Sequence, residues 1–193
     1  MLVIGNGESR KGVDLNKHYD KKIGCNAIHR DYHVDHLICV DRRMVQEAIT
    51  AGANSASIIY TRQDWGRDYI KSNSNIRYVP ELPYNGTERW DEPFQWGSGP
   101  YAILLAAKLD KKVDIIGFDL YSENLNINNI YKDTQGYDIS TKRPVDPRYW
   151  VHQIGKVFEI YSKRKFTIYQ KDNWSIPKAW DYPNVSLDNI NKL

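Results

Sequence analysis

The chain has 193 residues, of which 41% are hydrophobic and 26% are charged, and its net charge at pH 7 is +3. No apolar run approaches the roughly 18 residues that a membrane span needs. The N-terminus also lacks the basic and apolar regions of a secretory signal, so we expect a cytoplasmic protein. The small positive charge allows an anionic ligand but gives no reason to expect nucleic acid as a partner, and it leaves the oligomeric state open.

Short apolar runs of strand length recur along the chain, and several are continuous, as is typical of strands that are covered on both faces. We expect strands at residues 2–4, 22–25, 36–40, 57–60, 76–79, 113–118 and 165–169. Cys25 and Cys39 each lie in or at the end of such a run. Because there is no CxxC motif and no Cys/His spacing for zinc, we expect two buried, reduced thiols and no metal site of this kind.

Helical patterns lie between some of these runs, at residues 43–51, 101–109 and 150–163. The first pattern is followed by Gly52, a common helix stop. The second is rich in Ala and Leu, with Ser98 as the expected cap and Pro100 in the first turn. The third places its apolar residues at helical spacing.

The alternation of strands and helices predicts an α/β fold: a single Rossmann-like domain with a mostly parallel sheet flanked by helices. We assign residues 1–172 to this domain and expect residues 173–193 to pack on it as an irregular tail. Two stretches, 81–97 and 122–149, are too long for simple connections. Long loops in a compact domain are usually functional or mobile.

Polar groups follow several of the expected strands, where open α/β sheets bind their ligands. They are Gly5, Asn6, Gly7, Ser9, Asn26, Asp41 and Asp119. The two glycines allow the backbone to approach a ligand closely, and Asn6 offers both a donor and an acceptor. Position 10 is arginine, so the GxGxxG dinucleotide fingerprint is absent. A tight turn without a ligand explains the same residues equally well.

Polar residues later in the chain are further candidates, and each of them can have either a ligand-binding or a purely structural role. Ser98 and Gly99 open the Ala/Leu-rich helix, whose free N–H groups and dipole suit a phosphate, although a capped core helix has the same sequence. Tyr131 can bind phosphate oxygens without adding charge. His152 can serve as a general acid or base, although a histidine at a helix start is also often a cap or a surface group.

Taken in order, five stretches resemble a known family: VIGNGES, GCNAIHRDY, SGPYAILLAAKL, VDIIGFDLYS and HQIGKVFEIYSKRKFTIY. They are similar to bacterial sialyltransferases of the Campylobacter lipooligosaccharide type, and to the related fold of the archaeal 6-hydroxymethylpterin diphosphokinase-like proteins. The resemblance covers residues 2–30 and 97–170. Asp41 stands where the sialyltransferases usually carry Tyr-Asn-Pro, and is closer to the pterin diphosphokinase-like group.

The resemblance implies a CMP site and a role for each matching residue. Asn6, Asn26 and Ser98 would hold the nucleotide, together with Gly5, Gly7, Ser9, Asp41 and Gly99 around them. Tyr121 and Tyr131 would bind the donor phosphate, and His152 would be the catalytic base.

Three functions follow as alternatives. The first is a glycosyltransferase-like enzyme that moves a sugar from a nucleotide, such as a CMP-sugar, to a glycan or small-molecule acceptor without a cofactor. The second is a phosphoryl or diphosphoryl transferase that needs Mg²⁺, with Asp41 and Asp119 as ligands. The third is a nucleotide-binding module without catalytic activity.

Overall fold

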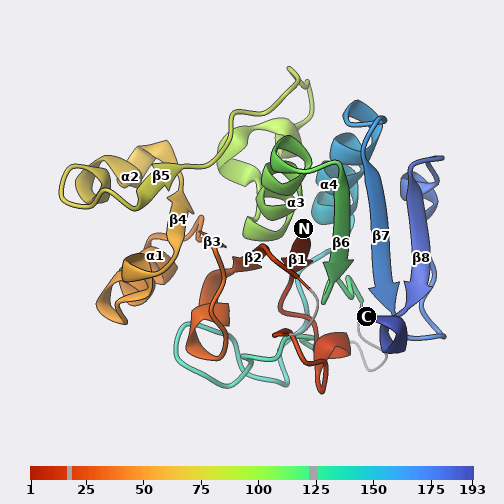
Figure 1. Cartoon of the computed structure of the whole chain (residues 1–193), viewed down its shortest axis with the longest axis horizontal. Coiled ribbons are helices and arrows are strands. Elements are labelled where there is room, and N and C mark those ends of the chain that lie inside the picture. Colours follow the sequence, from red (N-terminus) through yellow and green to blue (C-terminus); the bar gives the residue numbers. More distant parts are fainter. Residues whose placement is uncertain (17–18, 122–125) are drawn as a thin grey trace.

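A computed structural model of the protein describes residues 1–16, 19–121 and 126–193. Its centre is a sheet of eight strands in the order β5-β4-β3-β2-β1-β6-β7-β8 (Figure 1). Each pair of neighbouring strands in the described sheet is parallel. The strands are β1 (Leu2–Ile4), β2 (Lys22–Cys25), β3 (His36–Ile38), β4 (Ile58–Thr61), β5 (Ile76–Tyr78), β6 (Lys112–Ile116), β7 (Lys165–Gln170) and β8 (Val185–Asn189). The predicted α/β fold with a parallel sheet is therefore confirmed.

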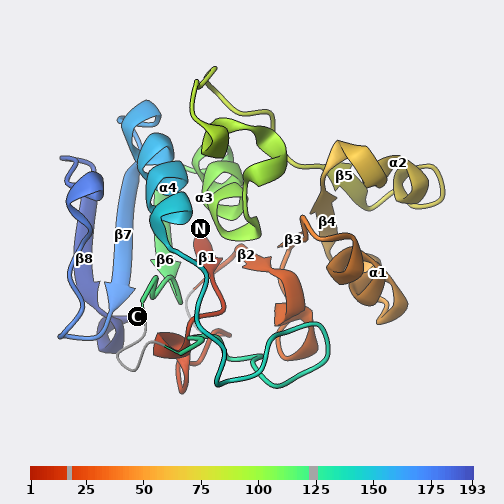
Figure 2. The same cartoon turned by 180° about the vertical axis from the view of Figure 1, so that it is seen from behind.

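The helices are α1 (Arg42–Thr50), α2 (Gln63–Ile70), α3 (Ser98–Leu109) and α4 (Arg148–Ile160). Helices α3 and α4 pack against each other on the face of the sheet that is turned to the viewer in Figure 2. Their buried side chains form one core cluster with that face, and α1 contributes to a second cluster on the opposite face. Among the described residues, no helix combines the length and the apolar composition that a bilayer-spanning segment requires.

The sheet reverses its strand order between β1 and β6. From β1 the chain builds strands outward to β5, and then returns through α3 to place β6 on the other side of β1. Two hydrogen bonds continue this pairing beyond the strand ends: Gly5 N–H donates to the Ile116 carbonyl (2.8 Å) and Gly7 N–H donates to the Gly117 carbonyl (2.9 Å). A Cβ on Gly5 would lie 2.3 Å from the Gly117 carbonyl oxygen, so this close approach requires glycine.

The long segment 126–147 crosses beneath the carboxyl ends of β1 to β3, drawn in blue-green in Figure 1. Ile130 N–H donates to the Asn6 carbonyl (2.8 Å). Arg30, at the end of the short 3-10 turn that follows β2, donates to Thr134 Oγ1 (2.8 Å). This segment is therefore attached to the strand ends, close to where the sequence predicts a ligand site.

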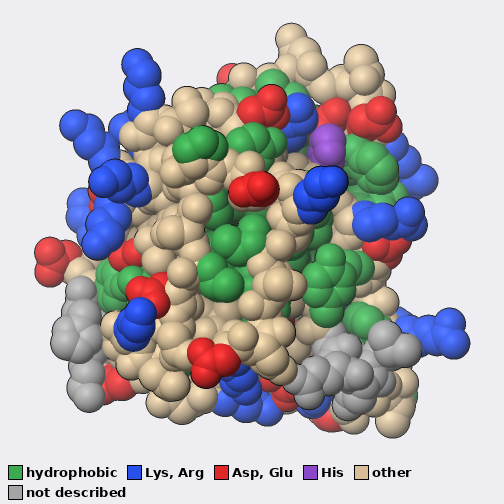
Figure 3. Space-filling view, turned by 90° about the vertical axis from the view of Figure 1, so that its right-hand side faces the viewer, with side chains coloured by type: hydrophobic (Ala, Val, Ile, Leu, Met, Phe, Trp, Pro, Cys, Tyr) green, Lys and Arg blue, Asp and Glu red, His purple; other side chains and the backbone are tan. Residues whose placement is uncertain are grey.

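Two expectations about regular structure need correction. The tail 173–193 is not wholly irregular, because Val185–Asn189 forms β8 in parallel with β7. This strand has only two apolar residues, and one of them, Leu187, is 40% exposed, so the sequence carries little strand signal. Figure 3 looks onto this outer strand, where hydrophobic side chains gather in the middle of the surface. Helix α2 has no counterpart among the expected elements.

The expected burial of both cysteines is confirmed, since Cys25 and Cys39 are free and buried. Burial raises the pKa of the Cys25 thiol to about 12. The thiol is therefore protonated near neutral pH and is a poor nucleophile. Of the long stretch 122–149, residues 122–125 lie outside the described residues.

Candidate functional site

A cleft of about 790 Å³ opens at the carboxyl ends of the strands, beside the point where the strand order reverses. This is where open α/β sheets bind ligands. The start of α3 and parts of the segment 126–147 complete its walls. The lining residues are 5–7, 25–26, 40–41, 94–100, 117–121, 127–129, 137–138 and 142–145, together with Arg62, Trp150 and Ile154.

Most of the predicted site residues line this one cleft. They are Gly5, Asn6, Gly7, Asn26, Asp41, Ser98, Gly99 and Tyr121. The others, Ser9, Tyr131 and His152, do not line it. Because the eight come from five separate parts of the chain, their convergence is a property of the fold rather than of sequence proximity.

Ser98 joins three of these chain segments. Its hydroxyl donates to Asn26 Oδ1 (2.8 Å) and accepts from the Val40 backbone N–H (3.2 Å). The expectation that Ser98 caps α3 is wrong, because the cap is Gly97 and Ser98 is the first helical residue. Its side chain instead fixes the helix start to the ends of β2 and β3. Helix geometry leaves the N–H groups of Ser98 and Gly99 without intrahelical acceptors.

Asn6 is held by its amide nitrogen and leaves its amide oxygen free. Asn6 Nδ2 donates to the Cys25 carbonyl (3.2 Å) and to the Tyr137 hydroxyl (3.2 Å). Asn6 Oδ1 is buried and has no donor within the described residues. A buried acceptor without a partner costs about 1–3 kcal/mol, so a ligand O–H or N–H at this position would be favourable.

Tyr137 is a site residue that the sequence did not reveal. It belongs to the segment 126–147, which has no periodic pattern that would place a side chain at the strand ends. Burial raises the pKa of its hydroxyl, so the group is neutral and hydrogen-bonds to Asn6.

Charged side chains of both signs line the cleft. Arg62 stacks over the Trp65 ring, with 4.2 Å from its guanidinium carbon to the ring centroid, and donates to the Phe94 carbonyl (2.9 Å). Lys142 pairs with Asp138 (2.7 Å), and Arg143 follows it at the surface. Because Arg62 also pairs with Asp64 (2.5 Å) and Lys142 pairs with Asp138, an anionic ligand would compete with these carboxylates for the two cations.

Asp119 lies in the cleft wall but is engaged on its inner side. Oδ2 accepts from the Ser9 N–H (2.8 Å), and Oδ1 accepts from the Ser9 hydroxyl and from Gln170 Nε2 (2.9 Å). Ser9 is thus a structural partner of Asp119. With both oxygens occupied, Asp119 does not fit a magnesium site shared with Asp41. No group of three His, Cys, Asp or Glu side chains in the described ranges could hold a metal ion.

Tyr131 lies behind the glycine turn rather than in the cleft. Its side chain is only 4% exposed, and its hydroxyl accepts from Arg10 Nη2 (3.1 Å). Arg10 Nε in turn donates to the Gly5 carbonyl (2.8 Å). Burial raises the pKa of the Tyr131 hydroxyl. Tyr131 therefore supports the turn, and of the two predicted phosphate ligands only Tyr121 faces the cleft.

His152 lies on the wrong face of α4 to act in the cleft. Trp150 and Ile154, one helical turn apart, line the cleft, and His152 between them points away. Its Nε2 lies 2.7 Å from Asp91 Oδ1, and its ring packs on Trp90 at 5.3 Å between centroids. The predicted base is therefore a partner of a buried carboxylate.

The Asp91–His152 contact predicts a stability effect. Burial alone would raise the pKa of Asp91, but the hydrogen bonds from His152 and Tyr84 hold it below its usual value. A His152→Ala variant should lose about 1–3 kcal/mol of unfolding free energy at pH 7, because Asp91 loses a partner. The loss should shrink as the pH falls below about 4 and Asp91 becomes protonated.

Urea denaturation of the His152→Ala variant over this pH range measures the effect. His33→Ala, which removes an exposed histidine, is the matched control. A His152 variant as stable as the wild type, with impaired turnover, would contradict the structural role.

Comparisons with protein-family models, curated proteins and solved structures found no significant match. The class of the protein is defined by its own fold and site: it is a Rossmann-like α/β protein with a polar cleft at the switch point of its parallel sheet.

Proposed function

We propose that the protein binds a nucleotide-activated sugar in this cleft and is a glycosyltransferase-like enzyme of the sialyltransferase-like kind. The observation that carries the proposal is the convergence of Asn6, Asn26 and Ser98 in one cleft at the switch point, with Ser98 bonded to Asn26. These are the residues that the family resemblance implies for the nucleotide.

The donor phosphate would bind at the start of α3. Free N–H groups and the positive end of a helix dipole favour a phosphate, and the N–H groups of Ser98 and Gly99 lie at the cleft. Tyr121, which is exposed in the cleft wall, would donate its hydroxyl to the same phosphate. The exposed Arg143 would offset part of the charge of the departing nucleotide, and Arg62 would contribute by exchanging its Asp64 partner for the phosphate.

Asp41, rather than His152, would be the proton acceptor. Asp119 and Asp138 are already engaged by Ser9 and Lys142, whereas the exposed Asp41 follows β3 in the cleft wall. In the proposed reaction an acceptor oxygen attacks the anomeric carbon, the bond to the phosphate oxygen breaks, and the hydroxyl proton passes to Asp41. A general base of this kind contributes about 10²–10⁴-fold to the rate.

A nucleotide-binding module without transfer activity is the second candidate. It is favoured by the position of His152, which leaves the cleft without the base that the resemblance implies. The magnesium-dependent phosphoryl transferase receives less support, because Asp119 is already occupied by Ser9 and Gln170.

A thermal-shift panel of CMP, CDP, GTP and ATP, each with and without Mg²⁺, tests the proposal. We expect CMP and CDP to raise the melting temperature without Mg²⁺. A ligand at a hundredfold excess over its dissociation constant stabilises the folded state by about 2.7 kcal/mol. Release of CMP from a CMP-sugar then separates an enzyme from a module.

Asp41→Asn is the matched variant for this assay. It should retain the thermal shift and lose sugar transfer by about 10²–10⁴-fold. Stabilisation that requires Mg²⁺, or no stabilisation by any nucleotide, would contradict the proposal. Nucleotide binding without any release of CMP from a CMP-sugar would instead support the nucleotide-binding module without transfer activity.

A further inference from the structure

Lysines are concentrated at the edge of the sheet opposite the cleft, where the strands begin. Strand β2 starts at Lys22, β6 at Lys112 and β7 at Lys165. These strands are close neighbours, because β2 and β6 flank β1, and Lys112 is in register with Lys165. With about 4.8 Å between neighbouring strands, the amino ends of β2, β1, β6 and β7 span roughly 15 Å.

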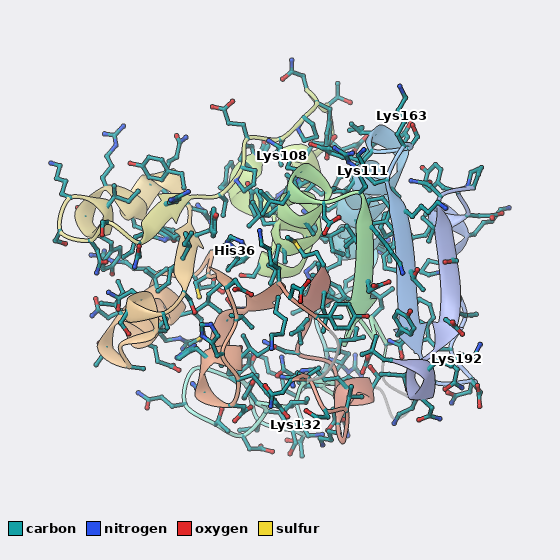
Figure 4. All side chains as sticks on the ribbon, in the orientation of Figure 1. His36, Lys108, Lys111, Lys132, Lys163 and Lys192 are labelled. Atoms are coloured by element: carbon teal, nitrogen blue, oxygen red, sulfur yellow. The ribbon has the colours of Figure 1, made fainter. Side chains whose placement is uncertain are left out.

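Exposed lysines project from these amino ends and from the adjoining turns. We call Lys21, Lys108, Lys111, Lys112, Lys163 and Lys165 the basic edge. Figure 4 shows Lys108, Lys111 and Lys163 beyond the amino ends of β6 and β7, whereas Lys132 and Lys192 lie toward the opposite edge of the sheet. Asp110 lies within this group, and its Oδ1 accepts from the backbone N–H groups of Lys111 (2.6 Å) and Lys112 (3.2 Å). Its Oδ2 pairs with the N-terminal ammonium of Met1 (3.3 Å), so this carboxylate is engaged by backbone N–H groups and the chain terminus. Lys108 Nζ donates to the Glu81 carbonyl (3.3 Å), a neutral acceptor that leaves the charge of the lysine uncompensated.

Two large aliphatic side chains stand among these lysines. Leu109 is the last residue of α3 and is 51% exposed, and Ile160 is the last residue of α4 and is 39% exposed. The two helix ends are neighbours, because Arg164 Nε donates to the Ala107 carbonyl (3.0 Å). The basic edge therefore combines positive charge with exposed aliphatic side chains.

We propose that the basic edge binds the surface of a membrane that contains anionic lipids. Lysines near such a surface are attracted to the negative headgroups, and apolar side chains beside them gain by entering the boundary between headgroups and acyl chains. Leu109 and Ile160 favour lipid over nucleic acid, which binds through phosphate contacts and aromatic stacking. This inference does not depend on the proposed function of the cleft.

Co-sedimentation with vesicles tests this proposal. The full chain should pellet with vesicles of phosphatidylcholine and phosphatidylglycerol in equal parts, and should remain in solution with phosphatidylcholine alone. The Lys111→Glu/Lys163→Glu variant should bind at least about tenfold more weakly, since each lysine near an anionic bilayer adds its own share to the binding free energy. The Leu109→Ser/Ile160→Ser variant should also bind more weakly but should keep the salt dependence of the wild type, because its lysines are unchanged.

A matched control is Lys171→Glu/Lys192→Glu, which changes the net charge equally at two exposed lysines, one directly after β7 and one near the C-terminus, both toward the carboxyl edge of the sheet. An equal loss of vesicle binding in this control would overturn the proposal, as would no binding to the anionic vesicles. Tighter binding of the wild type to labelled duplex DNA than to anionic vesicles at the same salt would assign the edge to nucleic acid instead. Nucleotide thermal shifts measured on the same variants distinguish a failure here from a failure of the cleft.

Discussion

Asp119→Ala is expected to cause the largest loss of stability among single substitutions at the site, about 3–5 kcal/mol of unfolding free energy, because three buried donors lose their acceptor and each costs about 1–3 kcal/mol. The carboxylate is 7% exposed and accepts hydrogen bonds from Ser9 and Gln170. Alanine would leave these buried donors without an acceptor and would remove the link between the turn after β1 and strand β7.

Chemical denaturation at neutral pH measures this loss, with Asp41→Ala as the control. Asp41 is an exposed carboxylate in the same cleft, and its removal should change stability by no more than about 0.5 kcal/mol. If Asp119→Ala were as stable as Asp41→Ala, the carboxylate would not have the structural role that its contacts indicate, and its role as a magnesium ligand would need to be considered again.

Asn6→Ala is expected to have the largest effect on ligand binding. Asn6 lines the cleft, and its Oδ1 is a buried acceptor without a donor among the described residues, so a nucleotide that reaches this oxygen would supply that donor. Removing the oxygen should weaken CMP binding by about 1–3 kcal/mol, or about 5- to 150-fold, because the ligand group would be left unpaired.

Isothermal titration calorimetry with CMP measures this change, with near-UV circular dichroism to establish that the variant is folded. Asn73→Ala, at the turn before β5, is the matched control and should bind CMP as the wild type does. Unchanged affinity in a folded Asn6 variant would mean that Asn6 only closes the turn with Cys25 and Tyr137.

The sequence predicted most of the sheet because buried parallel strands are continuous apolar runs. β1 and β2 were predicted at their observed bounds for this reason. Helix α2 and strand β8 were missed for the opposite reason. α2 buries only Gly66, and β8 is an outer strand with no fully buried side chain, so neither carries a strong hydrophobic pattern.

The site was predictable where a residue directly follows a strand. Asn6, Asn26 and Asp41 follow closely after β1, β2 and β3, and parallel strands bring their carboxyl ends to the same edge. Arg62 also comes directly after a strand, but nothing in the sequence indicated that it would turn into the cleft. The prediction for His152 depended on which face of α4 it occupies, and sequence distance from a motif does not determine that face.

The length of β6 separates the two surfaces for which we propose partners. The five residues of β6, Lys112–Ile116, run from the basic edge to Gly117, which lines the cleft. At about 3.3 Å per residue, this is roughly 16 Å. A protein lying on a bilayer by its lysine-rich edge would therefore hold its cleft above the headgroups and open to the surrounding water. With the proposed transferase activity, a protein held in this way would not modify the sugar next to the lipid, but would reach freely diffusing acceptors or the outer end of a chain of several sugars.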